Sequence, residues 1–326
     1  MMDREFMRLR EEGNGKEPAS PIGGFTLVEL LVVMAILSGA MAAIYSLYTV
    51  QQRTAYIQEE VVEVQQNVRV AMDSISADLR NAGLLIPGTS NPVSAASNGG
   101  GPGGSDIVTL NTTSAASVFA VIDADLPVAN LTAIPVIFTM RSDADVNLFA
   151  VGNIVRVISP GEQDQPMDDT GNPIDASFTV DALLAGPPRL RLIKTAGADA
   201  TGVQFNKGDM IARTGGAPYP STLMYCLGAN GANCSGGATV VADCPAGQLC
   251  FIKEDNGTPA VVATNMTDLQ FSYIQDSTTA EVGVPANFAQ VRAVRTVITG
   301  ATVDTAAISG TAKSREVNTV VKIRNR

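Results

Sequence analysis

The feature that most constrains this chain is an apolar run close to its amino terminus. Residues 30–52 carry no charged side chain and consist mostly of Leu, Val, Ile, Ala and Met. At about 1.5 Å per residue, the segment 25–50 forms a helix of about 39 Å, which exceeds the roughly 30 Å hydrocarbon core of a bilayer. We therefore predict that residues 25–50 form a transmembrane helix.

Three simpler interpretations of this run are a buried core helix, a cleaved secretory signal and an ordinary one-pass anchor. A soluble core helix rarely needs so many uncharged residues, and the apolar region of a secretory signal is only about 7–15 residues long. The small pair Gly23-Gly24 precedes the apolar run, whereas a secretory cleavage site follows it. An ordinary anchor gives no reason for Glu29, which would cost about 2.5–3.5 kcal/mol at the centre of a bilayer and less near its edge.

The residues around Glu29 form a longer pattern. The string Ile22-Gly-Gly-Phe-Thr-Leu-Val-Glu-Leu-Leu31 follows a polar leader. The leader's basic residues favour a cytoplasmic position for it. These residues are Arg4, Arg8, Arg10 and Lys16.

In residue types and spacing, this amino-terminal region resembles a type IV prepilin. The resemblance implies that a prepilin peptidase cuts after Gly24, that the new amino terminus at Phe25 is N-methylated, and that Glu29 is the fifth residue of the mature chain. The Glu29 carboxylate of one subunit could then neutralise the terminal amine of its neighbour. Each buried charge would be compensated by the other, so assembly would supply an ion-pair partner that the isolated subunit lacks.

The helix is predicted to continue beyond the membrane, over residues 25–82 in all. The segment contains no proline, and Gly83 and Pro87 follow it as helix-ending residues. Apolar residues three or four apart predict one face that packs on a sheet. These residues are Ile57, Val61, Val64, Val68, Met72, Ile75 and Leu79. The charged residues between them are interpreted as a solvated face, namely Glu59, Glu60, Glu63, Asp73, Asp78 and Arg80.

The rest of the chain consists of two segments that differ in composition. Residues 83–105 are rich in glycine and predict a flexible linker, and they lack the GK[ST] ending of a phosphate-binding loop. From residue 106 onward, short β-branched and apolar runs broken by Gly, Pro, Asn and Asp predict strands. The predicted strands are 106–110, 118–122, 134–140, 148–158, 177–184, 189–194, 208–213, 222–227, 249–253 and 260–264, with alternating segments at 269–273 and 317–323.

These predictions divide the chain into four parts: a leader 1–24, a long helix 25–82, a linker 83–105 and one β-rich domain 106–326. The expected fold class is α+β of the type IV pilin kind. The amphipathic half of the helix would pack on an antiparallel, β-rich carboxyl-terminal domain.

The carboxyl-terminal pattern is similar to that of a particular branch of the superfamily. The segments 266–273, 291–295 and 315–325 resemble the end of PilW-like minor pilins and of the related PulJ/GspJ pseudopilins. The resemblance implies a minor pilin that acts in priming and assembly at the pilus tip. A J-type pseudopilin of a type II secretion system and a tip adhesin or ligand-binding subunit are the alternatives.

The resemblance also implies partners and a location. The partners are other minor pilins, the major pilin, the inner-membrane assembly platform, the prepilin peptidase, and membrane lipid before assembly. The chain would cross the inner membrane once, with a cytoplasmic leader and a periplasmic carboxyl-terminal domain, and would then join an extracellular pilus.

Cys226, Cys234, Cys244 and Cys250 lie close together in the sequence. An even number of cysteines in an oxidising compartment predicts two disulfides, for which three connectivities are possible. We favour sequential pairing, 226 with 234 and 244 with 250. A four-cysteine zinc site is the alternative, but the spacing includes no C-x-x-C pair.

The composition argues against catalysis and nucleic-acid binding. The chain has no histidine, which removes the usual general base and the commonest metal ligand. Its net charge of -10 supplies no basic footprint for nucleic acid. We therefore expect no enzyme activity, no cofactor, no metal and no direct nucleic-acid partner.

Two weaker signals remain. One oxygen-rich stretch of the sequence can be interpreted as a calcium-binding loop or as an acidic turn between strands. Its spacing does not fit an EF-hand, and the acidic turn is the simpler interpretation. Its residues are Asp164, Asp168, Asp169, Gly171, Asn172 and Asp175. Basic residues near the carboxyl terminus are interpreted as a solvent-exposed face, namely Arg292, Arg295, Lys313, Arg315, Lys322, Arg324 and Arg326.

Overall fold

The structure is a computed structural model of the 326-residue chain. The chain divides into two compact units, with the boundary between Ala55 and Tyr56, and each unit is described by itself. The structure describes residues 24–84, 86, 90–101, 104–113, 118–131, 135–159, 166–168, 170–172, 174, 176–197, 200–213, 220–229, 232–235, 243–276, 280–303 and 311–323. Leader residues 1–23, Pro87, Asp164, Asp169, Asp175, Arg324 and Arg326 lie outside these ranges.

The helix α1 spans Leu27–Asn81, close to the predicted range 25–82. Thr26 begins it: its carbonyl accepts from the backbone N–H of Glu29 and Leu30, and its hydroxyl Oγ1 lies 3.3 Å from the Glu29 nitrogen. A threonine at this position satisfies N–H groups that have no partner inside the helix. The single interior glycine, Gly39, leaves the helix continuous.

The second half of α1 buries one face against a sheet within the second unit. The buried residues recur every three or four positions, as one helix face requires. They are Val64, Val68, Ala71, Met72, Ile75, Ser76 and Leu79. The predicted face is therefore present from Val64 onward, whereas Ile57 and Val61 are only half-buried.

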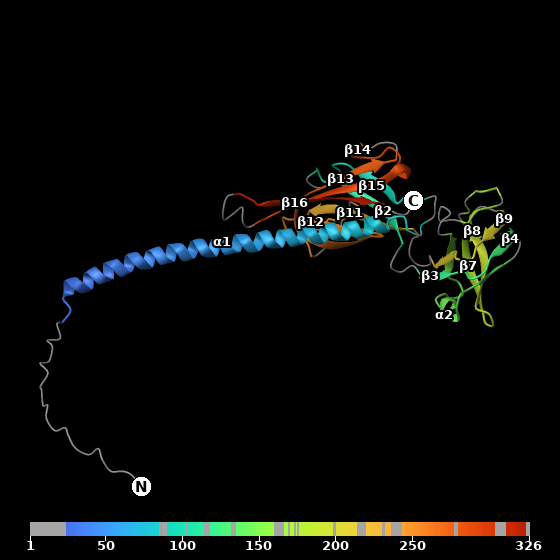
Figure 1. The fold of residues 1–326 in the computed structure, drawn as a ribbon, viewed down its shortest axis with the longest axis horizontal. Helices are drawn as coiled ribbons and strands as arrows, with labels where there is room; N and C mark the ends of the chain where they lie inside the picture. Colours follow the sequence, from blue (N-terminus) through green and yellow to red (C-terminus); the bar gives the residue numbers. More distant parts are fainter. Residues whose placement is uncertain are drawn as a thin grey trace, which may run out of the picture. The chain divides into compact units, whose positions relative to one another are not determined.

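The sheet beneath α1 has the order β1-β2-β11-β12-β13-β15-β16, with β14 paired to β13, and neighbouring strands are antiparallel (Figure 1). Its strands are β1 Val93–Ser97, β2 Ile107–Thr112, β11 Ser221–Ala229, β12 Leu249–Asp255, β13 Thr258–Gln275, β14 Glu281–Val282, β15 Val291–Ala301 and β16 Ser314–Lys322. A short 3₁₀ helix, η2, covers Phe288–Gln290.

The helix and this sheet enclose one hydrophobic core. The buried helix residues pack with alternating strand residues such as Leu110, Phe251 and Leu269. Tyr225 and Phe251 stack with ring centroids 5.3 Å apart. The predicted fold class is confirmed: a long amino-terminal helix packs on an antiparallel, β-rich carboxyl-terminal domain.

Three predictions about this sheet were wrong in part. The predicted linker 83–105 contains strand β1, which pairs with β2 and buries Val93 completely. The predicted strands 260–264 and 269–273 belong to one continuous strand, β13. Strand β15 was not predicted, because its apolar residues do not alternate strictly with polar ones.

Residues between β2 and β11 form a second sheet with the order β3-β10-β6-β7-β8-β5 and a separate pair, β4-β9. The strands are β3 Val118–Val121, β4 Leu126–Asn130, β5 Val136–Thr139, β6 Ile154–Ile158, β7 Ser177–Leu184, β8 Arg189–Ala196, β9 Thr201–Phe205 and β10 Met210–Arg213. The short helix α2, Asp143–Val146, follows β5. The segment 148–153, predicted as the start of a strand, precedes β6 and is not part of it.

This second sheet has its own hydrophobic core. Phe138, Phe178 and Phe205 lie at its centre, with the Phe138 and Phe205 ring centroids 4.9 Å apart in an edge-to-face arrangement. The segment 106–326 therefore contains two large cores, where a single ectodomain core was expected. We call residues 113–220, which connect β2 to β11, the inserted module.

Candidate functional site

The first candidate site is the start of α1. Gly24 and Phe25 precede the helix, and Phe25 is 74% exposed. No atom of the described chain beyond its neighbours lies within 4 Å of where a Gly24 Cβ would be. Within the described part of the chain, the peptide bond between Gly24 and Phe25 is thus free of tertiary packing.

Glu29 lies in the first turn of α1, where its backbone N–H is capped by Thr26. A carboxylate in a first turn is favoured by the positive end of the helix dipole. It is also the only charged residue between Leu27 and Gln52. The side chain is exposed and has no partner within the described part of the chain.

The helix surface around Glu29 is apolar and uncovered. Every residue from Leu27 to Gln52 is exposed, including large side chains such as Leu31, Ile36 and Leu47. This segment is the one helix in the described residues that is long and apolar enough to cross a membrane. So large an apolar surface requires cover by lipid or by other protein chains.

A second candidate site joins α1 to the sheet. Asp78 accepts hydrogen bonds from the Tyr225 hydroxyl and from Lys253 Nζ, the latter at 2.6 Å, and Ser74 Oγ lies 3.5 Å from the same hydroxyl. Asp78 was predicted on a solvated face, and this was wrong because its side chain is 20% exposed and contacts residues of β11 and β12. A cavity of about 380 Å³ adjoins it, lined also by Leu223 and by polar side chains from β2, β11 and β12.

The chemistry of this cluster fits a structural role. Burial raises the pKa of Tyr225 well above its usual value, and the nearby Asp78 carboxylate adds to the effect. The tyrosine is therefore a hydrogen-bond donor at neutral pH and no nucleophile. Sequence reasoning missed the cluster because an isolated aspartate on a helix looks the same whether solvent or a lysine lies beside it.

Asp106 is a buried carboxylate that the sequence did not indicate. It is 1% exposed, and its two oxygens accept from the Gly99 N–H at 2.8 Å and the Phe271 N–H at 2.7 Å. Together with burial, which is the larger cause, it raises the pKa of Tyr273 above its usual value. Its role is to tie the β1–β2 connection to β13.

The four cysteines form two disulfides with the sequential pairing. Cys226 bonds to Cys234 and Cys244 bonds to Cys250, with Cα atoms 5.4 Å and 6.0 Å apart. All four pack with Ile252 in a small core of their own. Because both sulfurs of each pair are used, these cysteines do not form the alternative zinc site.

The oxygen-rich loop is only partly within the described residues. Asp168 Oδ1 accepts from Thr170 Oγ1 at 2.7 Å and from the Asn172 N–H at 2.8 Å. These bonds, led by that from Thr170, hold the pKa of Asp168 below its usual value. Where the structure describes the chain, no group of three acidic or cysteine side chains suits a metal ion. The described half of this loop is a turn whose carboxylate is already occupied.

Two of the basic residues near the carboxyl terminus form ion pairs. Arg292 pairs with Asp276, and Arg295 Nη2 lies 2.7 Å from Glu281 Oε1. Glu281 also accepts from Ser272 at 2.7 Å, and this bond and Arg295 lower its pKa. These residues therefore do not present a bare positive patch.

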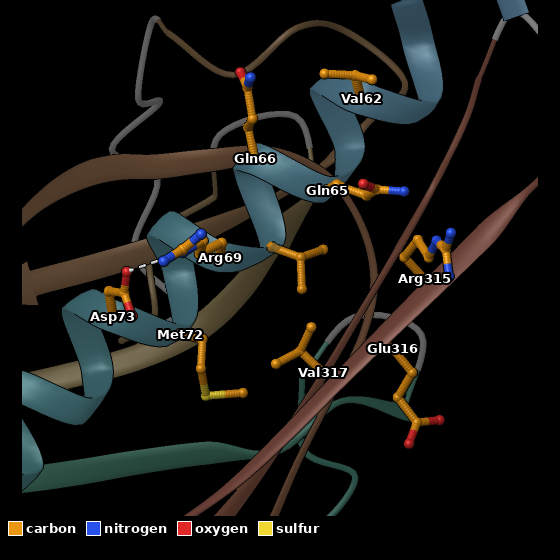
Figure 2. A pocket seen from close by; sticks show the side chains of 10 residues that line it. Val62, Gln65, Gln66, Arg69, Met72, Asp73, Arg315, Glu316 and Val317 are labelled. Carbon is orange, nitrogen blue, oxygen red and sulfur yellow. Dashed lines mark ion pairs between the residues drawn. The ribbon is translucent and has the colours of Figure 1, made fainter. Parts of the chain in front are cut away.

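A third candidate site is a groove between α1 and β16. It has a volume of about 740 Å³, and Figure 2 shows it between the two elements. The helix contributes Val62, Gln65, Gln66, Val68, Arg69, Met72 and Asp73, and the strand contributes Arg315, Glu316 and Val317.

Comparison with known proteins identifies the first of these sites. Residues 21–45 match the family described as the prokaryotic N-terminal methylation motif. No curated protein and no solved structure matches the chain. The motif indicates a precursor of the type IV pilin or pseudopilin kind, a structural class whose leader is removed by prepilin peptidase and whose subunits assemble with other pilins.

Proposed function

We propose that this chain is a minor pilin of a type IV pilus, which acts in priming and assembly at the pilus tip. The observation that carries the proposal is the methylation motif at residues 21–45, placed at the start of an uncovered apolar helix with one carboxylate in its first turn. The carboxyl-terminal resemblance to PilW-like minor pilins supports the finer assignment.

In this proposal the membrane helix has two successive environments. The segment 25–50 first lies in the inner membrane, with the leader 1–24 in the cytoplasm and the carboxyl-terminal domain in the periplasm. Prepilin peptidase then cuts after Gly24, and Phe25 becomes the N-methylated terminus. In the pilus, the apolar surface of this segment contacts other pilin helices instead of lipid.

In this proposal, Glu29 stabilises the assembled pilus relative to the isolated subunit. The cationic amine at Phe25 and the Glu29 carboxylate of a neighbouring subunit compensate each other's loss of hydration. The pairing is made between subunits, so an isolated chain keeps an uncompensated carboxylate near the membrane edge. Other minor pilins and the major pilin are the partners, with the assembly platform extracting the chain from lipid.

The size of the inserted module supports the proposed tip position. A second sheet with its own core enlarges the ectodomain beyond what the helix and first sheet need. A bulky ectodomain would crowd a regular helical lattice, so low copy number and an end position suit it. The domain boundaries 1–24, 25–82, 83–105 and 106–326 form part of the proposal, with β1 now included in the third segment.

Processing and assembly can be tested separately in the native host with three full-length variants. We expect Gly24→Val to leave the chain with its leader, and Glu29→Gln to give a chain that begins at Phe25 but is absent from sheared fibres. Gly39→Ala is the matched glycine control, since the described chain offers no clash there. Mass spectrometry of the amino-terminal peptide and immunoblots of the fibres are the measurements. A native chain that retains Met1 in every fraction would refute the proposal.

A second candidate function, ligand binding at the tip, is favoured by the inserted module itself. It has a core of its own, and among the described residues its strands do not pair with those of the first sheet. A variant without residues 113–220 should still be cleaved after Gly24 and enter fibres. If that variant also leaves adhesion of piliated cells unchanged, the ligand-binding role is excluded.

A further inference from the structure

The two edges of the first sheet differ in a way that points to an interaction surface. Strand β1 forms one edge, and it has only five residues and a register shift between Val93 and Ala95. Short edge strands and bulges are common protections against unwanted strand pairing. Strand β16 forms the other edge with nine residues and an unbroken register to β15.

The backbone of β16 offers unused hydrogen-bonding groups along that edge. The Ile323 N–H donates to the Arg292 carbonyl at 2.9 Å, and the Thr302 N–H donates to the Lys313 carbonyl at 3.0 Å. In an antiparallel ladder these bonds recur every second residue. Odd-numbered residues of β16 therefore bond to β15, and the N–H and C=O groups of Glu316, Asn318 and Val320 point outward, with no partner in the part of the chain that the structure describes.

The sequence of β16 leaves the centre of this edge unprotected. Residues 317–321 read Val-Asn-Thr-Val-Val, with no charge and no proline. Val317 and Val320, which lie on opposite faces of the strand, are 38% and 43% exposed. A nine-residue edge strand with a β-branched, uncharged centre is a template for another strand.

The groove between α1 and β16 lies beside the same edge. Val317 points toward the helix, where Val62, Val68 and Met72 supply the apolar wall, whereas Glu316 points away (Figure 2). Val62 is 51% exposed.

Three charged side chains lie at the rim of the groove. Arg69 and Asp73 form an ion pair on the helix at 3.8 Å, and Arg315 adds a positive charge on the strand, on the same face as Val317. With the Gln65 amide oriented to accept, its oxygen lies 3.1 Å from Arg315 Nε. A side chain entering from the edge therefore meets apolar walls, with one net positive charge at the rim.

We propose that β16 and this groove bind an extended segment of another protein chain, which adds to the sheet as a further strand. Its backbone bonds to Glu316, Asn318 and Val320. Every second side chain of the segment is apolar and enters the groove beside Val62 and Val317. The remaining side chains lie on the opposite face beside Val320.

A second copy of this chain is a poor occupant, and this choice of partner rests on the proposed membrane anchoring. Pairing of β16 with β16 about a two-fold axis is antiparallel and points the two α1 helices in opposite directions, whereas copies anchored in one membrane enter it in the same direction. Pairing of β16 with β1 of another copy meets the short, irregular edge described above. The occupant is therefore a different chain of the assembly.

Photo-cross-linking in native cells tests the proposal with full-length chain that carries benzoylphenylalanine at Asn318 or at Val320. Thr267, exposed on β13 within the sheet, is the control position. We expect both edge positions to attach to one partner chain, at residues two apart, because an added strand advances in register with β16. The control position should give no such product.

A proline substitution makes the test specific for strand addition. Val320→Pro removes an outward N–H and keeps the β15 ladder, so it should reduce cross-linking from position 318 about tenfold, whereas Val320→Thr should preserve it. Unchanged cross-linking with proline, scattered attachment sites, or attachment to residues 314–322 of a second copy would each overturn the proposal. The amino terminus of the same samples is sequenced, so a failure of cleavage after Gly24 is seen separately.

Discussion

At the scale of single residues, Gly300 sets how closely the helix approaches the sheet. A Cβ on Gly300 would lie 2.7 Å from Val68 Cγ2, 3.0 Å from Val64 Cγ1 and 3.1 Å from the Asn265 carbonyl oxygen. The two valines are stiff at χ1 in a helix and cannot rotate away easily. A glycine is required here by space and not by backbone conformation.

Gly300→Ala should therefore destabilise the chain by about 1–3 kcal/mol, as overpacking of a tight core does. Val68→Ala in the same chain should recover part of that loss, because it removes the methyl group closest to the new Cβ. Urea unfolding of the detergent-solubilised full chain, followed by tyrosine fluorescence, measures both. If the changes in unfolding free energy caused by the two substitutions are simply additive, the close approach of helix and sheet is not the reason for a glycine at this position.

Ionisation of Tyr225 makes the free energy of unfolding depend on pH in the alkaline range. Burial raises its folded-state pKa above the value of about 10 that it has when unfolded, so the folded state holds the proton more tightly. The resulting stability is fully present below about pH 10 and falls above it, by about 1.4 kcal/mol per pH unit.

Tyr225→Phe should lose less stability than the wild-type chain between pH 9 and pH 11. Tyr56→Phe is the control, since Tyr56 is 62% exposed. Urea midpoints at the two pH values give the comparison. Equal losses in the wild-type chain and in Tyr225→Phe would contradict the assignment of this pH dependence to Tyr225.

At the scale of elements, α1 carries its strongest polar contact close to its carboxyl end. An aspartate in that position is disfavoured by the helix dipole, so Asp78 depends on the proton donors of the sheet. Lys253 Nζ and the Tyr225 hydroxyl supply them. The contact fixes the rotation of α1 about its own axis relative to the strands. Apolar packing alone constrains this rotation less strictly.

Asp78→Ala should cost about 2–3 kcal/mol, because it leaves the half-buried Lys253 and the buried Tyr225 without their acceptor. Asp73→Ala, five residues earlier on the same helix, is the control. Its side chain is 76% exposed and pairs with Arg69 at 3.8 Å, so the loss should stay within about 0.5 kcal/mol. Similar losses at both positions would argue against the contact with the sheet.

Elements differ in how well the sequence predicts them, for physical reasons. The buried face of α1 follows from local spacing, and strands such as β7 and β12 follow from short runs of apolar and β-branched residues. Strand β1 was missed because its residues, Val-Ser-Ala-Ala-Ser, gain their strand structure only from pairing with β2. The contact between Asp78 and Lys253 depends on a helix–sheet arrangement that no local pattern encodes.

At the scale of the whole molecule, the chain is a helix and a sheet with a second sheet inserted at one connection. Thr112 at the end of β2 lies opposite Ser221 at the start of β11 in the antiparallel register. The ends of the inserted module are therefore as close as those of a tight hairpin. The sequence could not reveal this insertion, because strand order depends on contacts between residues far apart in the chain.

Replacement of residues 113–220 by Asn-Gly, a favoured two-residue hairpin turn, should leave the helix and first sheet folded. In detergent, we expect the free energy of unfolding of the remaining core to change by no more than about 1 kcal/mol, with both disulfides formed. Circular dichroism, urea unfolding and thiol titration without reductant are the measurements. A chain that aggregates or exposes free thiols would show that the first sheet needs the module.

The amino-terminal site was the most predictable part of the chain, because Gly24, Phe25 and Glu29 form a local pattern at the start of one helix. Residues 21–45 match the methylation motif, and the cleavage, methylation and pairing of those three residues remain predictions. The groove beside β16 could not be predicted, since α1 and β16 come from opposite ends of the chain.

The junction between Thr112 and Ser221 also makes the molecule a natural display scaffold. A foreign domain whose termini lie as close together as those of a tight hairpin should replace residues 113–220 without altering the helix and the first sheet. We expect the same junction to tolerate sequence variation within the inserted module while residues 21–45, which match the methylation motif, stay unchanged.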